Sequence, residues 1–72
     1  MSDTPHYSLI IAWSDEDQVY VVSLPEWGEL MHTHGESYEE ALQRGKELIA
    51  ALVASRQQHG EPLPQPRVFT SV

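Results

Sequence analysis

Two histidines one residue apart, His32 and His34, are the first candidates for chemistry in this sequence. On a β-strand, residues at this spacing point to the same side, and Glu29 or Glu36 could lie close to them. A metal site needs three or four converging ligands, each held in place by supporting hydrogen bonds. Two histidines on a polar strand are therefore better explained as surface residues. The sequence predicts no metal site and no cofactor.

Other reactive arrangements are equally sparse. The chain has no cysteine, and no local motif brings serine, histidine and an acid together for nucleophilic catalysis. The acidic run Asp15-Glu16-Asp17 lacks the glycine and the distal glutamate of a calcium loop, which favours a solvated turn. We therefore expect no enzymatic activity.

The sequence favours binding over catalysis. Trp27 stands between a proline and a glycine, with Glu26 and Glu29 nearby, and an aromatic side chain rimmed by charge is typical of a binding hot spot. The alternative, that Trp27 folds back to close one end of a small core, fits the sequence equally well. The partner-binding residues predicted from these patterns are Asp15, Glu16, Asp17, Glu26, Trp27 and Glu29.

The net charge narrows the choice of partner. Eleven acidic and four basic side chains give a formal charge of −7, which repels nucleic-acid phosphates and attracts basic proteins. We therefore expect no direct nucleic-acid binding, and a cationic protein as the partner if there is one. The acidity could also serve solubility alone.

The elements that must position these residues begin with three predicted strands. Residues 7–13 and 19–24 are rich in aromatic and β-branched side chains, and an acidic turn at residues 14–18 without glycine favours a longer hairpin loop. Pro25 and Gly28 end the second strand, and the more polar residues 29–34 predict a third strand at a sheet edge.

A helix is predicted over residues 38–59. Ser37 and Glu40 have the spacing of a capping box, in which Ser37 accepts from the amide of Glu40 while the glutamate reaches back. Apolar residues then recur every three or four positions, and Gly60 is the natural terminator. Gly45 interrupts this pattern, which suggests a close crossing between helix and strand.

Beyond the helix, prolines at 62, 64 and 66 predict an extended return segment, and residues 68–72 have the composition of a last strand. The expected fold is a single α+β domain over residues 1–72, in the order β-β-β-α-β. Its mixed four-stranded sheet has the order 3-2-1-4, with the helix on one face. The other face stays uncovered, and a chain this short buries only around 60% of its unfolded surface, so a homo-oligomer is expected. The residues predicted for self-association are Trp13, Val68 and Phe69.

The location follows from what the sequence lacks. Its first residues have neither the basic nor the apolar region of a signal peptide, and no apolar run reaches the roughly 18 residues of a membrane span. Together with the absence of cysteine, this predicts a cytoplasmic protein without membrane contact.

Two stretches together resemble the HicB-like antitoxin family: Val19-Tyr20-Val21-Val22-Ser23-Leu24-Pro25-Glu26, and Thr33-x-Gly35-x-Ser37-x-Glu39-Glu40-Ala41. The resemblance covers roughly residues 7–56. It implies a partial RNase H-like fold and the role of antitoxin in a type II toxin–antitoxin system, binding a small basic RNA-cleaving toxin of the HicA type.

Some features depart from the family. Complete HicB antitoxins usually add a C-terminal DNA-binding module where this sequence ends, so direct DNA binding is not expected, and the loop at residues 25–28 contains a tryptophan. Residues 7–13 contain no acid, so the metal-binding carboxylates of an RNase H-like nuclease are not expected. The rival interpretation is a self-assembling structural or adaptor module without a toxin partner.

Overall fold

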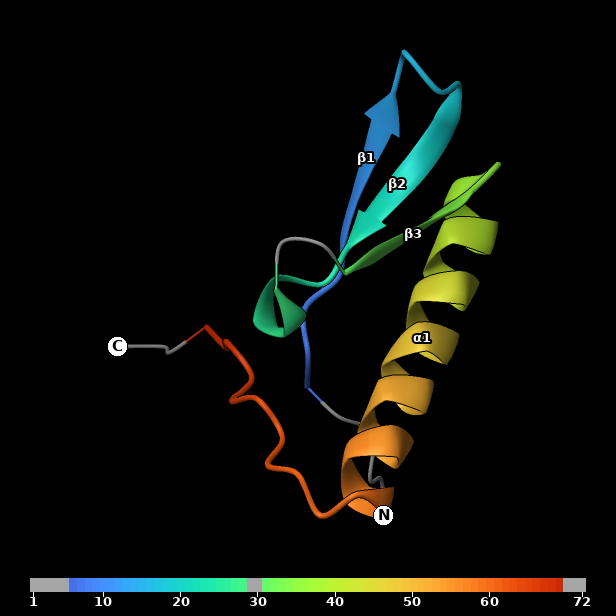
Figure 1. The fold of residues 1–72 in the computed structure, drawn as a ribbon. Helices are drawn as coiled ribbons and strands as arrows, with labels where there is room; N and C mark the ends of the chain where they lie inside the picture. The colour runs from blue at the N-terminus through green and yellow to red at the C-terminus, as the bar shows by residue number, and fades with distance from the viewer. Residues whose placement is uncertain (1–5, 29–30, 70–72) are drawn as a thin grey trace.

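A three-stranded antiparallel sheet followed by one long helix forms the fold in a computed structural model that describes residues 6–28 and 31–69 (Figure 1). The strands lie in the order β1-β2-β3, so β2 is central and both other strands are edges. A short 3-10 helix, η1, joins β2 to β3. The elements are β1 (Ile10–Ser14), β2 (Val19–Ser23), η1 (Pro25–Trp27), β3 (His32–Gly35) and α1 (Tyr38–Gln58).

The hairpin turn between β1 and β2 is a four-residue loop, as its lack of glycine predicted. Gln18 takes a left-handed conformation with φ of 57°, and its amide donates to the carbonyl of Ser14 at 2.8 Å. The Ser14 hydroxyl accepts from the amide of Asp17 at 3.2 Å. These bonds fix the acidic tip to the end of β1.

Helix α1 begins at the predicted cap. The Ser37 hydroxyl accepts from the amide of Glu40 at 3.0 Å, while the Glu40 carboxylate accepts from the amide of Glu36 at 2.6 Å, one residue before the expected partner. At the other end, the amide of Glu61 donates to the carbonyl of Arg56 at 2.8 Å beyond Gly60, whose φ is 66°. Both ends of the helix are therefore closed by specific hydrogen bonds.

The helix covers one face of the sheet, and the core lies between them. Val22, Leu24, Ala41 and Ile49 are buried there. A Cβ added at Gly45 would lie 2.7 Å from Leu9 Cδ2 and 3.0 Å from Val22 Cγ1, so the predicted close crossing at Gly45 is confirmed.

Gly35 makes a tighter contact that the sequence did not reveal. A Cβ at this position in β3 would lie 2.5 Å from the backbone nitrogen of Ala41. The first turn of α1 therefore rests directly on the backbone of β3.

The predicted four-stranded sheet of order 3-2-1-4 is wrong, because residues 61–69 form no strand. Pro62, Pro64 and Pro66 have no amide hydrogen to donate to a ladder. From Pro62 onward, the hydrogen bonds of this segment involve side chains instead: the Arg67 amide donates to Glu26, and Tyr7 Oη donates to the Pro64 carbonyl. The remaining residues of the predicted strand, 70–72, lie outside the described residues.

Strand β1 also begins later than predicted, at Ile10, because the chain before it is bonded elsewhere. The amide of Ser8 donates to the carboxylate of Glu26, so it is not available for a strand pair. The third strand starts at His32, and Glu29 lies outside the described residues. Over the described chain, no helix combines the length and apolar character needed to cross a membrane.

Candidate protein-binding surfaces

The predicted partner-binding residues that the structure describes, all but Glu29, lie at opposite ends of β2 and do not form one surface (Figure 1). Asp15, Glu16 and Asp17 form the turn before β2, while Glu26 and Trp27 belong to η1 after it. A five-residue strand spans about 17 Å, which sets the separation of the two groups. Each group must be considered alone.

Glu26 is occupied by bonds within the chain. Its carboxylate accepts from the Ser8 amide at 3.0 and 3.2 Å, from the Ser8 hydroxyl at 2.9 Å and from the Arg67 amide at 2.9 Å. Partial burial alone would raise the pKa of Glu26, but these donors together hold it below its usual value of 4.5. Glu26 therefore joins the two ends of the described chain to η1.

Trp27 packs against the core. Its ring meets Tyr7 edge to face, with centroids 5.1 Å apart, and the guanidinium carbon of Arg56 lies 5.4 Å from its centroid. Its indole Nε1 is buried and has no hydrogen-bond partner among the described residues. Of the two interpretations that the sequence left open, this placement agrees with Trp27 closing one end of the core.

Beside the acidic turn, three aromatic side chains lie in contact, and we refer to Trp13, Tyr20 and Tyr38 as the aromatic row. The ring centroids of Trp13 and Tyr20 are 5.0 Å apart, and those of Tyr20 and Tyr38 are 4.4 Å apart. Trp13 is 48% exposed and Tyr38 61% exposed, so both outer members of the row face solvent. Of these three residues, only Trp13 was predicted from the sequence to make contacts with a partner copy, because no local pattern shows that Tyr20 and Tyr38 meet.

Register and helix packing together build this row. Trp13 and Tyr20 are paired residues on adjacent strands, so their side chains share one face of the sheet. Tyr20 is also paired with Gly35, whose missing side chain lets the start of α1 approach. Tyr38, the first residue of α1, thereby reaches the ring of Tyr20.

The charged side chains of the turn beside Trp13 are all acidic. Asp15 Oδ1 lies 3.4 Å from the indole nitrogen of Trp13, which donates to it, and Asp15, Glu16 and Asp17 are all exposed. Residues 1–43 contain nine of the eleven acids and neither lysine nor arginine. All four basic residues follow them: Arg44, Lys46, Arg56 and Arg67.

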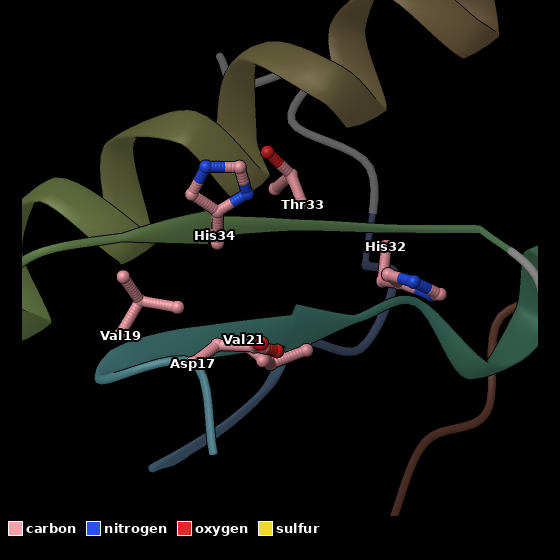
Figure 2. Close-up of a pocket in the computed structure, with 6 residues that line it drawn as sticks. All are labelled: Asp17, Val19, Val21, His32, Thr33 and His34. Carbon is pink, nitrogen blue, oxygen red and sulfur yellow. The ribbon is translucent and has the colours of Figure 1, made fainter. Parts of the chain in front are cut away.

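The sheet face turned away from α1 contains the two histidines. His34 is paired with Val21 and His32 with Ser23, so both histidines point to the open face. Figure 2 shows the hollow there, of about 410 Å³. Its lining residues are Asp17, Val19, Val21, His32, Thr33 and His34. Within residues 6–28 and 31–69, no group of three or more histidines and acids could hold a metal ion.

The residues predicted for self-association are separated in the same way. Trp13 belongs to the aromatic row, whereas Val68 and Phe69 lie in the extended C-terminal segment. Both are exposed, Val68 at 62% and Phe69 completely.

Comparison with known proteins does not identify a family for this chain. No family model, curated protein or solved structure matches the chain. The resemblance to HicB-like antitoxins therefore stays a prediction.

Proposed function

We propose that this chain is a non-enzymatic domain that binds a basic protein through its hairpin end. The observation that carries the proposal is the aromatic row, whose outer rings are exposed and which lies beside the three carboxylates of the hairpin turn. Residues 1–43, which contain the row and these carboxylates, have neither lysine nor arginine. Exposed aromatic rings supply contact area at low entropic cost, and the surrounding negative potential accelerates encounter with a cationic partner. The exposed rings and the negative charge therefore both favour binding of a basic protein.

The resemblance in the sequence suggests which basic protein this is. HicA-type toxins are small and basic, and we propose that the chain neutralises such a toxin in the cytoplasm as the antitoxin of a type II system. The sites differ from those first predicted, because Glu26 and Trp27 are engaged within the chain. The hairpin tip and the aromatic row take their place.

Binding of the purified chain to a HicA-type toxin tests this function. We expect a dissociation constant in the micromolar range or below, with affinity that falls as NaCl is raised from 50 to 300 mM because exposed charges are screened. Isothermal titration calorimetry measures both. The double variant Asp15→Asn/Asp17→Asn should bind several-fold more weakly.

Glu47→Gln is the matched control, since it also removes an exposed acid but lies in the middle of α1. It should bind as the unaltered chain does at moderate salt. Absence of toxin binding would contradict the antitoxin role.

The rival function is a self-assembling module. The open face of the sheet favours it, because Ile10 is 53% exposed there and Val19 and Val21 line the hollow on the same face. Light scattering coupled to size-exclusion chromatography separates the two functions. A stable oligomer that binds no toxin would support the module.

A further inference from the structure

We infer that the aromatic row receives an arginine side chain of the partner, with the guanidinium plane against the rings and its charge toward the hairpin carboxylates. This inference rests on the proposed function and specifies the chemical group that the hairpin end recognises. It concerns Trp13, Tyr20 and Tyr38 together with Asp15.

The geometry of the rings fits a flat cation. Tyr20 and Tyr38 are inclined by only 33°, whereas Trp13 stands at 68° to Tyr20, so the row presents ring faces in two directions. A guanidinium is planar and weakly hydrated, and it stacks on aromatic faces more readily than an ammonium does. The half-exposed Trp13 and Tyr38 are accessible for such contact.

The protein already makes this contact once. At the other end of the molecule, the guanidinium of Arg56 lies 5.4 Å from the centroid of Trp27, and the same group donates to the carbonyl of Pro62 at 2.7 Å. There the aromatic ring and the oxygen acceptor both come from this chain. At the hairpin end the ring and the carboxylate acceptor are present, and residues 1–43 contain no lysine or arginine.

The nearest basic residue along the chain does not fill this role. Arg44 lies six residues after Tyr38 in α1, nearly two turns further along, and pairs with the Glu40 carboxylate at 3.5 Å. Among the described residues, the carboxylate of Asp15 accepts from Trp13 and Gln18 only, at 3.4 and 3.5 Å, and both of these residues are exposed. Asp15 can therefore accept from an arriving guanidinium at the edge of the row.

The row is also held in place before any partner arrives. The cap at Ser37 fixes the start of α1, and the contact of Ala41 with Gly35 fixes that start against β3. Trp13 and Tyr20 are held by strand pairing. A preformed site loses less conformational entropy on binding, which favours a single arginine as an anchor.

Two synthetic peptides of equal charge, octa-arginine and octa-lysine, test the inference against the full chain. At 150 mM NaCl, calorimetry should give an affinity for octa-arginine that is roughly threefold to tenfold higher than the affinity for octa-lysine. In Tyr38→Ala the two affinities should become equal within twofold, and Tyr38→Phe should keep the preference because the ring is retained. Circular dichroism confirms that the variants fold.

Phe69→Ala is the matched control, because it removes another exposed aromatic ring from a segment far along the chain. It should keep the preference for arginine. Equal affinity of the unaltered chain for both peptides, or an unchanged preference in Tyr38→Ala, would overturn the inference.

Toxin binding and peptide binding together distinguish a failure of the arginine site from a failure of the antitoxin role. If a HicA-type toxin binds the unaltered chain and Tyr38→Ala equally well, the arginine site is wrong while the function stands. If the peptides are discriminated as expected but the toxin does not bind, the arginine site stands and the antitoxin role fails.

Discussion

Glu26 is the residue at which three separate segments of the chain meet. Its carboxylate lies in η1, and the donors that it accepts from belong to Ser8 before β1 and to Arg67 near the end of the described chain. Hydrogen bonds to a charged acceptor are stronger than those to a neutral one. The positions of Ser8 and Arg67, near the two ends of the described chain, therefore depend on the charge of one side chain.

The first prediction concerns the acid stability of the protein. The folded pKa of Glu26 lies below 4.5, so its stabilising effect is present above that pH and is lost as the pH falls through the folded value. Glu26→Gln should lower the free energy of unfolding at pH 7 by about 1–3 kcal/mol, since charge-assisted bonds are lost. The difference between the two proteins should shrink as the pH falls below 4.5 and through the lowered pKa of Glu26. Urea unfolding at a series of pH values measures it.

Glu40 is a second source of acid sensitivity that must be separated from Glu26. The amide of Glu36 and the neighbouring Arg44 also lower the pKa of the Glu40 carboxylate. Its acid sensitivity has the same sign, and Glu40→Gln should leave the contribution of Glu26 in place. A difference between Glu26→Gln and the unaltered protein that is the same at pH 3 and pH 7 would refute the role of the Glu26 charge.

Residues differ in how far the sequence reveals them. Ser37 was predictable as a cap because its partner stands three residues away and the pattern is local. Glu26 was recognised only as an acid in a loop, because its donors lie 18 and 41 residues away. No spacing rule relates such positions, and the same holds for Tyr20 and Tyr38 in the aromatic row.

At the scale of elements, two glycines set how closely α1 lies on the sheet. At Gly35 the atoms in the way are backbone atoms of Ala41 and Glu40, within 2.9 Å of an added Cβ. At Gly45 they are the ends of the Leu9 and Val22 side chains. Side-chain ends can move, whereas the helix backbone can yield only by shifting as a whole.

The second prediction compares these two positions. Gly35→Ala should destabilise the fold by about 1–3 kcal/mol, the usual cost of overpacking. Gly45→Ala should cost clearly less, because a gain in helix propensity of up to about 1 kcal/mol offsets the adjustment of Leu9. Thermal and urea unfolding give both values. Equal losses at the two sites would mean that the helix can shift freely on β3.

The elements themselves were largely predictable where local chemistry defines them. The glycine-free turn, the capped helix and the crossing at Gly45 follow from residue types at short spacing. The fourth strand was not predictable in this way, since a strand requires a neighbour as well as β-forming residues. Here the bond from Arg67 to Glu26 holds the segment at η1, and Val68 and Phe69 remain exposed.

At the scale of the whole molecule, charge is unevenly divided along the chain. The first 43 residues contain nine acids and no lysine or arginine, while all basic residues lie in α1 and the segment after it. In the described part of the chain, two ion pairs form, Arg44 with Glu40 and Arg56 with Glu61. Both are exposed, and such pairs contribute little to stability. We therefore expect repulsion among the acids of residues 1–43 to outweigh these two pairs.

This imbalance predicts how salt acts on the isolated protein. Raising NaCl from 10 to 150 mM shortens the Debye length from about 30 Å to about 8 Å, well below the molecular extents of 37 × 36 × 25 Å. Because screening relieves repulsion, Tm should rise by roughly 2–4 °C, which corresponds to about 0.5 kcal/mol for a domain of this size. Asp17→Asn should reduce the rise and Lys46→Gln should enlarge it, since they move the net charge in opposite directions. Differential scanning calorimetry at fixed pH measures all three proteins, and a Tm that falls with added salt would show that attraction between charges dominates instead.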